Sequence, residues 1–133
     1  TILQEAGAVY PTLSLMHELG VLVCGGCDAP RGTWSPYGRG DMLERARYLA
    51  QRNGMTNDFD LEYTARICTS GGAEGIGLDG YGLADGCFGD MVLVPARTLA
   101  EAVALVPGNR TVIRRGRVVV DAGKLVHDLP AVG

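Results

Sequence analysis

The sequence lacks three features that would point to particular functions. No stretch approaches the roughly 20 consecutive apolar residues of a membrane-spanning helix, and no secretory-signal pattern is present. Basic residues are not in excess, since 12 Lys and Arg stand against 15 Asp and Glu and the net charge is −3. Such a chain offers no basic field for nucleic acid. We therefore expect a cytoplasmic protein without membrane or nucleic-acid partners.

The chain has four cysteines. Two of them form Cys24-Gly25-Gly26-Cys27, a spacing found in redox pairs and in halves of zinc sites. A redox pair needs its first thiol at a helix N-terminus, and no helix is predicted for about a dozen residues after it. A structural zinc would need a second pair, whereas Cys68 and Cys87 stand apart. We expect buried, reduced thiols and keep a thiol-redox module as an alternative.

Glycine and apolar residues are abundant instead. The chain has 20 glycines among 133 residues, and 47% of its residues are hydrophobic. The glycines lie between periodic segments, which predicts tight loops and close backbone approaches. The apolar content suffices for a core, and the length suits one domain or part of a larger one.

Residues 1–85 predict a single strand among helices. Val21–Cys24 is continuously apolar, as in strands that are buried on both faces of a parallel sheet. A loop rich in glycine and proline follows it as far as Gly40. Helical periodicity and stop residues predict three helices. The first covers Thr12–Leu19, and the second runs from Asp41 to the stop at Asn53-Gly54. The third begins near Asn57 and is interrupted at Ser70-Gly71-Gly72, after which a short helical turn follows.

Residues 86–133 have a different pattern, and we place a domain boundary near Gly86. Thr98 and Glu101 form a capping box that predicts a helix to Leu105. Three strands are predicted, over Met91–Val94, Thr111–Arg114 and Arg117–Asp121, the last two joined by a tight hairpin at Arg115-Gly116. One strand in the first part and three in the second do not close a sheet, so both parts are expected to belong to larger sheets.

Three blocks of sequence carry a resemblance to a known family. The block CDAPRGTWSPYGRGDMLERA begins at Cys27 and contains an acid directly after the predicted strand, Asp28, and the only tryptophan, Trp34. It resembles the end of the catalytic barrel in the cytosine deaminase-like branch of the amidohydrolase superfamily. The blocks GLDGYGLADGCFGDMVLVPA and TVIRRGRVVVDAG follow in the same order. They resemble the stretch after that barrel and the hairpin of the family's small β-sandwich domain.

This resemblance implies an α/β fold and a hydrolytic function. Residues 1–85 would be the C-terminal fragment of a TIM-type (β/α)8 barrel, and residues 86–133 part of the small β-sandwich domain. The parent enzyme would use a divalent metal, Zn or Fe, to deaminate a small cyclic amine or amidine such as cytosine or an aminotriazine. Asp28 would bind the metal and shuttle protons for the attacking water, and Trp34 would line the substrate pocket.

Several positions depart from the family's pattern. Cys27 stands where His or Ser is usual, Gly32 where Asp is common, and Ala29 at a position that differs between relatives. The family's further metal ligands are histidines on earlier strands, whereas His17 and His127 lie in no matching context. One carboxylate cannot hold a catalytic metal that needs three or more protein ligands. We therefore expect this chain alone to be inactive and to retain no metal.

Plainer interpretations remain open. A carboxylate after a strand, such as Asp28, often only caps a loop, and Trp34 would also fit as an anchor that fills a hydrophobic gap. The alternative function is a non-catalytic domain that binds a partner or another copy of itself through open sheet edges. As an enzyme, the chain would have a small cyclic substrate and the missing barrel segment as partners.

Overall fold

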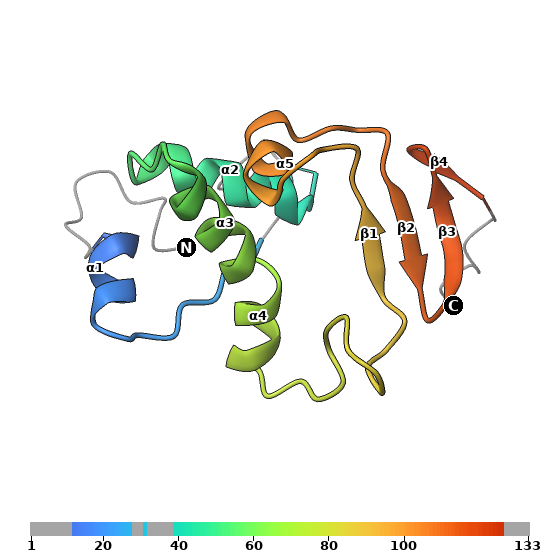
Figure 1. The fold of residues 1–133 in the computed structure, drawn as a ribbon, viewed down its shortest axis with the longest axis horizontal. Helices are drawn as coiled ribbons and strands as arrows, with labels where there is room; N and C mark the ends of the chain where they lie inside the picture. The colour runs from blue at the N-terminus through green and yellow to red at the C-terminus, as the bar shows by residue number, and fades with distance from the viewer. Residues whose placement is uncertain (1–11, 28–30, 32–38, 127–133) are drawn as a thin grey trace.

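The computed structural model describes residues 12–27, 31 and 39–126, and it places a group of helices beside a small sheet (Figure 1). In this part of the chain, no helix combines the length and the apolar character needed to cross a membrane. The elements, in chain order, are α1 (Leu13–Glu18), α2 (Met42–Arg52), α3 (Asp58–Ile67), α4 (Ser70–Gly75), β1 (Met91–Leu93), α5 (Leu99–Leu105), β2 (Thr111–Arg114), β3 (Arg117–Asp121) and β4 (Lys124–Leu125). The expected mixture of helix and sheet is confirmed, while the barrel and sandwich assignments stay predictions.

The predicted helix starts are confirmed, and the structure shows a side-chain cap at each of them. A cap oxygen accepts a hydrogen bond from an amide of the first turn, which otherwise has no partner within the helix. The donor–acceptor distances lie between 3.0 and 3.3 Å. The four caps are Thr12 for α1, Asp41 for α2, Asn57 for α3 and Thr98 for α5.

The core lies where α2, α3 and α5 meet. Ala46 and Ala50 on α2 and Ala65 on α3 are buried, and their small side chains let the helices pack closely. Val103 of α5 is fully buried in the same cluster. Figure 1 shows how α5, which comes after the predicted boundary near residue 86, returns to lie beside α2. The helices thus share one core, and the division into residues 1–85 and 86–133 stays a prediction.

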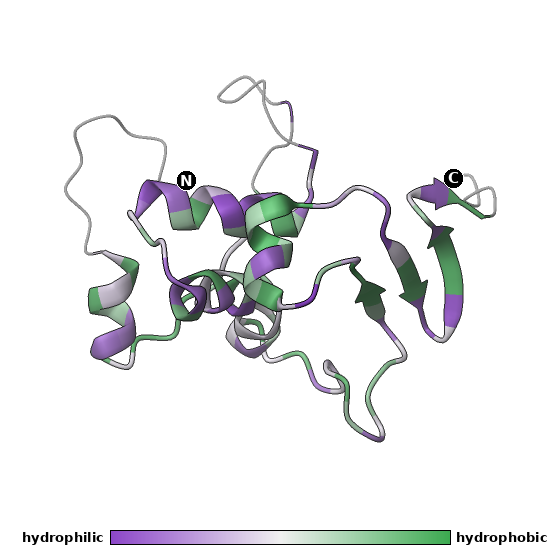
Figure 2. Cartoon of the chain, turned by 45° about the horizontal axis from the view of Figure 1, so that its top comes forward, coloured by the Kyte–Doolittle hydropathy of each residue, from purple (hydrophilic) through white to green (hydrophobic). Residues whose placement is uncertain are grey.

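The four strands form one antiparallel sheet in the order β1-β2-β3-β4. Val112 of β2 pairs with Val92 of β1 on one side and with Val120 of β3 on the other. The predicted hairpin is confirmed: Arg115 and Gly116 have φ angles of 48° and 74°, the positive values that a type I′ turn requires. Figure 2 shows that β1, β2 and β3 are largely apolar. The two-residue β4 was not predicted.

The predicted strand at Val21–Cys24 is wrong for the structure as described, because residues 21–27 pair with no strand. A β-strand is defined by a ladder of hydrogen bonds to a neighbour, and apolar composition alone does not supply one. Val21 and Leu22 are 48% and 51% exposed, so the burial on both faces that the composition suggested is also missing.

The break after α3 lies earlier than the sequence indicated. The glycines at Gly71 and Gly72 suggested an interruption, yet α4 already includes them and the break is at Thr69, with φ −131° and ψ −95°. The Thr69 hydroxyl donates to the Ala65 carbonyl at 2.8 Å and so satisfies the end of α3. A Cβ on Gly71 would lie only 3.0 Å from the Val23 carbonyl oxygen, so this glycine serves close packing rather than helix breaking.

Candidate functional site

The two residues to which the sequence assigned chemistry, Asp28 and Trp34, lie outside the described residues. The structure does describe the chain on both sides of them. Residues 23–27 lead into this stretch, and residues 39–41 lead out of it into α2. The geometry that bears on the site is therefore the way in which these two flanks are held.

The leading flank is held by close packing against the junction of α3 and α4. The Gly25 amide donates to the Ile67 carbonyl at 2.9 Å. A Cβ on Gly25 would lie 2.7 Å from the Cys68 sulfur, closer than two such atoms can approach. On α4, a Cβ on Gly75 would overlap the Cys24 sulfur. Two glycines on opposite sides thus allow the backbone to lie directly on the helices.

The last described residue before Asp28 is fixed by α2. Nη2 of Arg45 donates a hydrogen bond to the sulfur of Cys27 at 3.1 Å. Together with the Gly25 amide bond, this contact forms what we call the upstream anchor, which comprises Gly25, Cys27 and Arg45. It fixes the position of Cys27, which directly precedes Asp28 in the sequence.

The same contacts bear on the thiol-redox alternative. All four cysteines are free, and the sulfurs of Cys24 and Cys27 bond to different groups, since the Cys24 thiol donates to the Gly71 carbonyl at 3.1 Å. Burial raises the pKa of the Cys68 thiol to about 11, so this thiol is inert at neutral pH. The expectation of buried thiols holds for Cys68 and is wrong for Cys24, which is exposed at the surface.

The trailing flank is held by an ion pair. Asp41 caps α2 through the Leu43 amide and accepts two hydrogen bonds from Arg110, from Nη1 to Oδ1 at 3.0 Å and from Nη2 to Oδ2. Both side chains are only 20% exposed. The hydrogen bond from Arg110 lowers the pKa of Asp41 against the opposing effect of burial, and the same bond raises the pKa of Arg110. We call this pair the downstream anchor.

Helix α2 brings the two anchors together. Asp41 caps the helix, and Arg45 lies four residues further along, about 6 Å in rise along the axis. The chain on both sides of residues 28–40 is therefore tied to the first turns of a single helix.

Sequence reasoning missed Arg45 and Arg110. Asp41 was recognised as the start of a helix, but its partner lies 69 residues away and no local periodicity connects them. Arg45 was passed over because a charged residue at that position of an amphipathic helix fits a solvated face equally well. Neither arginine had a signal in a single sequence.

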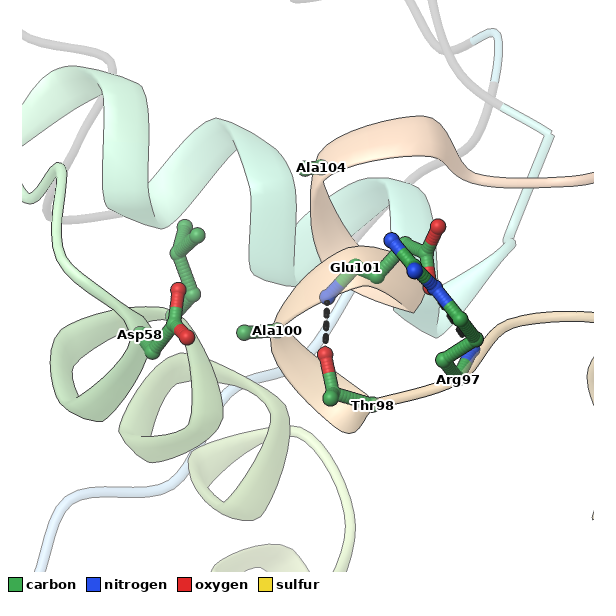
Figure 3. A pocket seen from close by; sticks show the side chains of 7 residues that line it. Asp58, Arg97, Thr98, Ala100, Glu101 and Ala104 are labelled. Carbon is green, nitrogen blue, oxygen red and sulfur yellow. Dashed lines mark hydrogen bonds and ion pairs between the residues drawn. The ribbon is translucent and has the colours of Figure 1, made fainter.

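An open hollow of about 430 Å³ lies between α3 and α5, away from the anchors (Figure 3). Asp58 lines it at the start of α3, whereas Gly25 contacts Ile67 at the other end of that helix, about 14 Å away along the axis. Glu101 at the start of α5 accepts the Arg97 amide at 2.7 Å, which lowers the pKa of this carboxylate. The Arg97 guanidinium is 91% exposed and contacts Glu101 only through Nε, at 3.4 Å.

The described residues do not by themselves form a metal centre. Among residues 12–27, 31 and 39–126, no three His, Cys, Asp or Glu side chains gather closely enough to hold an ion. His17 is exposed, and its ring lies against that of Tyr63 with centroids 4.3 Å apart. His127 lies outside the described residues.

Comparison with known proteins gives consistent matches over almost the whole chain. The sequence pattern of the amidohydrolase family matches residues 2–125. Among curated proteins, N-isopropylammelide isopropyl amidohydrolase of Pseudomonas sp. (strain ADP) is 30% identical over 113 residues, which cover 83% of this chain and 28% of that protein.

Solved structures give the same result in three dimensions. The crystal structure of N-isopropylammelide isopropylaminohydrolase from Burkholderia multivorans is 45% identical with a TM-score of 0.85, covering 92% of this chain and 32% of that one. The structure of 5-methylcytosine deaminase from Klebsiella pneumoniae with 5-fluorocytosine is 25% identical with a TM-score of 0.73, covering 91% and 30%. The chain thus spans about a third or less of the length of these relatives.

Proposed function

Because the chain belongs to the amidohydrolase family, we propose that it forms the C-terminal part of an enzyme that hydrolyses an exocyclic C–N bond of a small ring. The observation that carries this proposal is the similarity to the isopropylaminohydrolase, with 45% identity and a TM-score of 0.85. The weaker match to the 5-methylcytosine deaminase supports a cytosine-like ring as the second candidate substrate. The substrate class is therefore an N-alkylated aminotriazine of the N-isopropylammelide type, or failing that a cytosine-like ring.

Within this proposal Asp28 is the residue that handles protons. Its carboxylate accepts a proton from the attacking water and returns it to the leaving amine. A divalent metal, Zn or Fe, would activate that water in the parent enzyme, and of the ligands such an ion requires we assign only Asp28 to this chain. This assignment is supported by the upstream anchor, which fixes Cys27 directly before Asp28. Trp34 would pack its flat ring against the substrate.

The isolated chain is proposed to be incompetent. A catalytic metal needs three or more protein ligands, and the described residues supply no such group. Residues 1–85 would complete the barrel and residues 86–133 the small sheet domain of the parent. Both would have to dock with barrel segments from elsewhere for turnover to occur.

A chimera tests the proposal. This chain replaces the matched segment of the Burkholderia enzyme, and release of isopropylamine from N-isopropylammelide and of ammonia from cytosine is measured. We expect turnover by the chimera and a loss of about 1,000-fold or more in Asp28→Asn, because a neutral amide cannot carry the proton. Asp79→Asn, at an exposed aspartate, is the matched control and should keep full activity. A folded chimera that turns over neither substrate, or an active Asp28→Asn variant, would refute the proposal.

One observation favours the alternative of a non-catalytic binding domain. Strand β1 is one edge of the sheet, and its three residues Met91, Val92 and Leu93 are 37%, 51% and 55% exposed. An apolar edge strand is a template for pairing with another chain. Sedimentation velocity distinguishes the two functions: a concentration-dependent dimer that Val92→Lys abolishes would support self-association, and a monomer at all concentrations would count against it.

A further inference from the structure

Helix α2 holds an arginine whose charge has no partner in the described part of the chain. The Nε atom of Arg47 is buried and donates to no acceptor, and among the described residues it is the one buried side-chain nitrogen or oxygen in this state. No described carboxylate lies within ion-pair distance of Arg47, although the sequence has 15 Asp and Glu. A guanidinium stays protonated at physiological pH, so Arg47 keeps both its charge and its unmet donors.

Arg47 lies at the border of the face by which α2 packs on the core. It directly follows the buried Ala46, and the buried Leu49 comes two positions later. The residue is only partly buried, and its two Nη groups, which are not among the buried unpartnered atoms, are open at the surface. Long charged side chains normally keep their charged end in water, and a buried donor without an acceptor destabilises a fold. The isolated fold therefore does not explain the position of this guanidinium.

Two other partly buried arginines show what such a residue does in this molecule. Arg45 donates to the sulfur of Cys27, 18 residues away, and Arg110 donates to Asp41, 69 residues away. Each of them joins two segments that are distant in sequence. Arg47 has a similar setting without the partner, and this chain covers only 32% of the Burkholderia isopropylaminohydrolase. The missing acceptor is therefore expected in the part of the parent enzyme that this chain does not include.

We infer that Arg47 is an interface residue whose Nη groups bind the carboxylate of an Asp or Glu from the rest of the proposed parent enzyme. The inference rests on the proposed function for the existence of that parent. Two parallel N–H groups of a guanidinium match the two oxygens of a carboxylate, which favours an acidic side chain over a single backbone carbonyl. Such a pair fixes the register of the docked surface and disfavours any surface with a basic residue at that point.

Replacing Arg47 by methionine should act in opposite directions in two contexts, because methionine keeps an apolar stem and removes every donor. In the 133-residue chain, Arg47→Met should leave the urea midpoint unchanged or raise it by up to about 0.5 M, since a buried unmet donor disappears. In the chimera with the Burkholderia enzyme, the same change should lower Tm by about 5 °C, since a carboxylate loses its cation. Arg52→Met, at an exposed arginine of the same helix, is the matched control and should shift neither value measurably.

Cross-linking identifies the carboxylate itself. Arg47→Lys places a primary amine at this position, and a carbodiimide joins an amine to a carboxylate in direct contact as an amide, with loss of water. In the chimera, we expect a cross-link from this position to an Asp or Glu of the Burkholderia part, located by mass spectrometry of the digested protein. The chimera with Arg47 intact is the control, because a guanidinium does not react in this way.

Three results would overturn the inference. They are a fall of the urea midpoint in the Arg47→Met chain, an unchanged Tm of the folded Arg47→Met chimera, and a cross-link to an acid of this chain or of a second copy. If the chimera does not fold, the urea experiment alone decides. None of these measurements needs a substrate. A folded chimera without turnover would refute the proposed hydrolase and leave the role of Arg47 standing, whereas an active chimera without the Tm shift would refute only that role.

Discussion

The two anchors beside residues 28–40 differ in the physics that holds them. The upstream anchor depends on close backbone packing, with Gly25 lying against Ile67 and Cys68 where no side chain would fit. The downstream anchor depends on charge, through Asp41 and Arg110. Packing fails when volume is added, and an ion pair fails when a proton or a substitution removes its charge. The two flanks are therefore sensitive to different perturbations, Gly25 to added volume and Asp41 to loss of charge.

The largest effect is expected from adding volume at the upstream anchor. Gly25→Ala should lower the free energy of unfolding by about 2 kcal/mol, because the new Cβ overlaps the Cys68 sulfur in a closely packed junction. Gly26→Ala is the matched control, since nothing lies within 4 Å of a Cβ at that position. Urea denaturation followed by circular dichroism measures both variants. Equal stabilities of the two alanine variants would show that the packing is looser than described.

A smaller loss is expected at the downstream anchor. Arg110→Met should lower the free energy of unfolding by about 1.5 kcal/mol, because it leaves the partly buried Asp41 carboxylate without its cation. Arg97→Met removes an arginine that is 91% exposed and should cause no change beyond the error of the same denaturation experiment. If Arg110→Met and Arg97→Met lost the same free energy of unfolding, the partly buried ion pair would contribute no more stability than the exposed one.

The smallest expected effect is a dependence of stability on pH, which arises at the downstream anchor because Asp41 titrates there. Arg110 lowers the pKa of Asp41 below its usual 3.8, so the pair stabilises the fold fully above the unfolded-state pKa. This contribution is lost as the pH falls through the lowered folded-state pKa. Between pH 5 and pH 2, the wild-type chain should therefore lose more stability than Asp41→Asn, which cannot titrate there. The unfolding temperatures of the wild-type chain and of Asp41→Asn are measured across this pH range. If both fell by the same amount, the ion pair between Asp41 and Arg110 would be contradicted.

Local chemistry explains which parts of the fold could be predicted. The caps Thr12, Asp41, Asn57 and Thr98 and the Arg115-Gly116 turn each act within a few residues, and a sequence window contains all that they need. The segment Val21–Cys24 has the composition of a strand, but strand formation depends on a neighbour that composition does not specify.

The rest of the site depends on contacts between distant residues. Arg110 and Asp41 are 69 positions apart, and the bond from Arg45 to Cys27 spans 18. Gly71 was interpreted as a helix breaker, whereas its role is to leave room for the carbonyl of Val23. That carbonyl comes from a distant segment, so the sequence around Gly71 does not indicate it. The assignment of chemistry to Asp28 came from the resemblance to the amidohydrolases, and it remains a prediction.

The position of α5 has a consequence for how the molecule folds. Strands β1 and β2 are antiparallel neighbours, yet a tight turn does not join them, because α5 lies between them in the chain with Val103 fully buried in the helical core. Closing this long link costs conformational entropy unless α5 has docked. Pairing of β1 with β2 and assembly of the helices are therefore coupled steps. The sheet and the helices should unfold in one cooperative transition, with loss of strand signal and of helix signal at the same denaturant concentration.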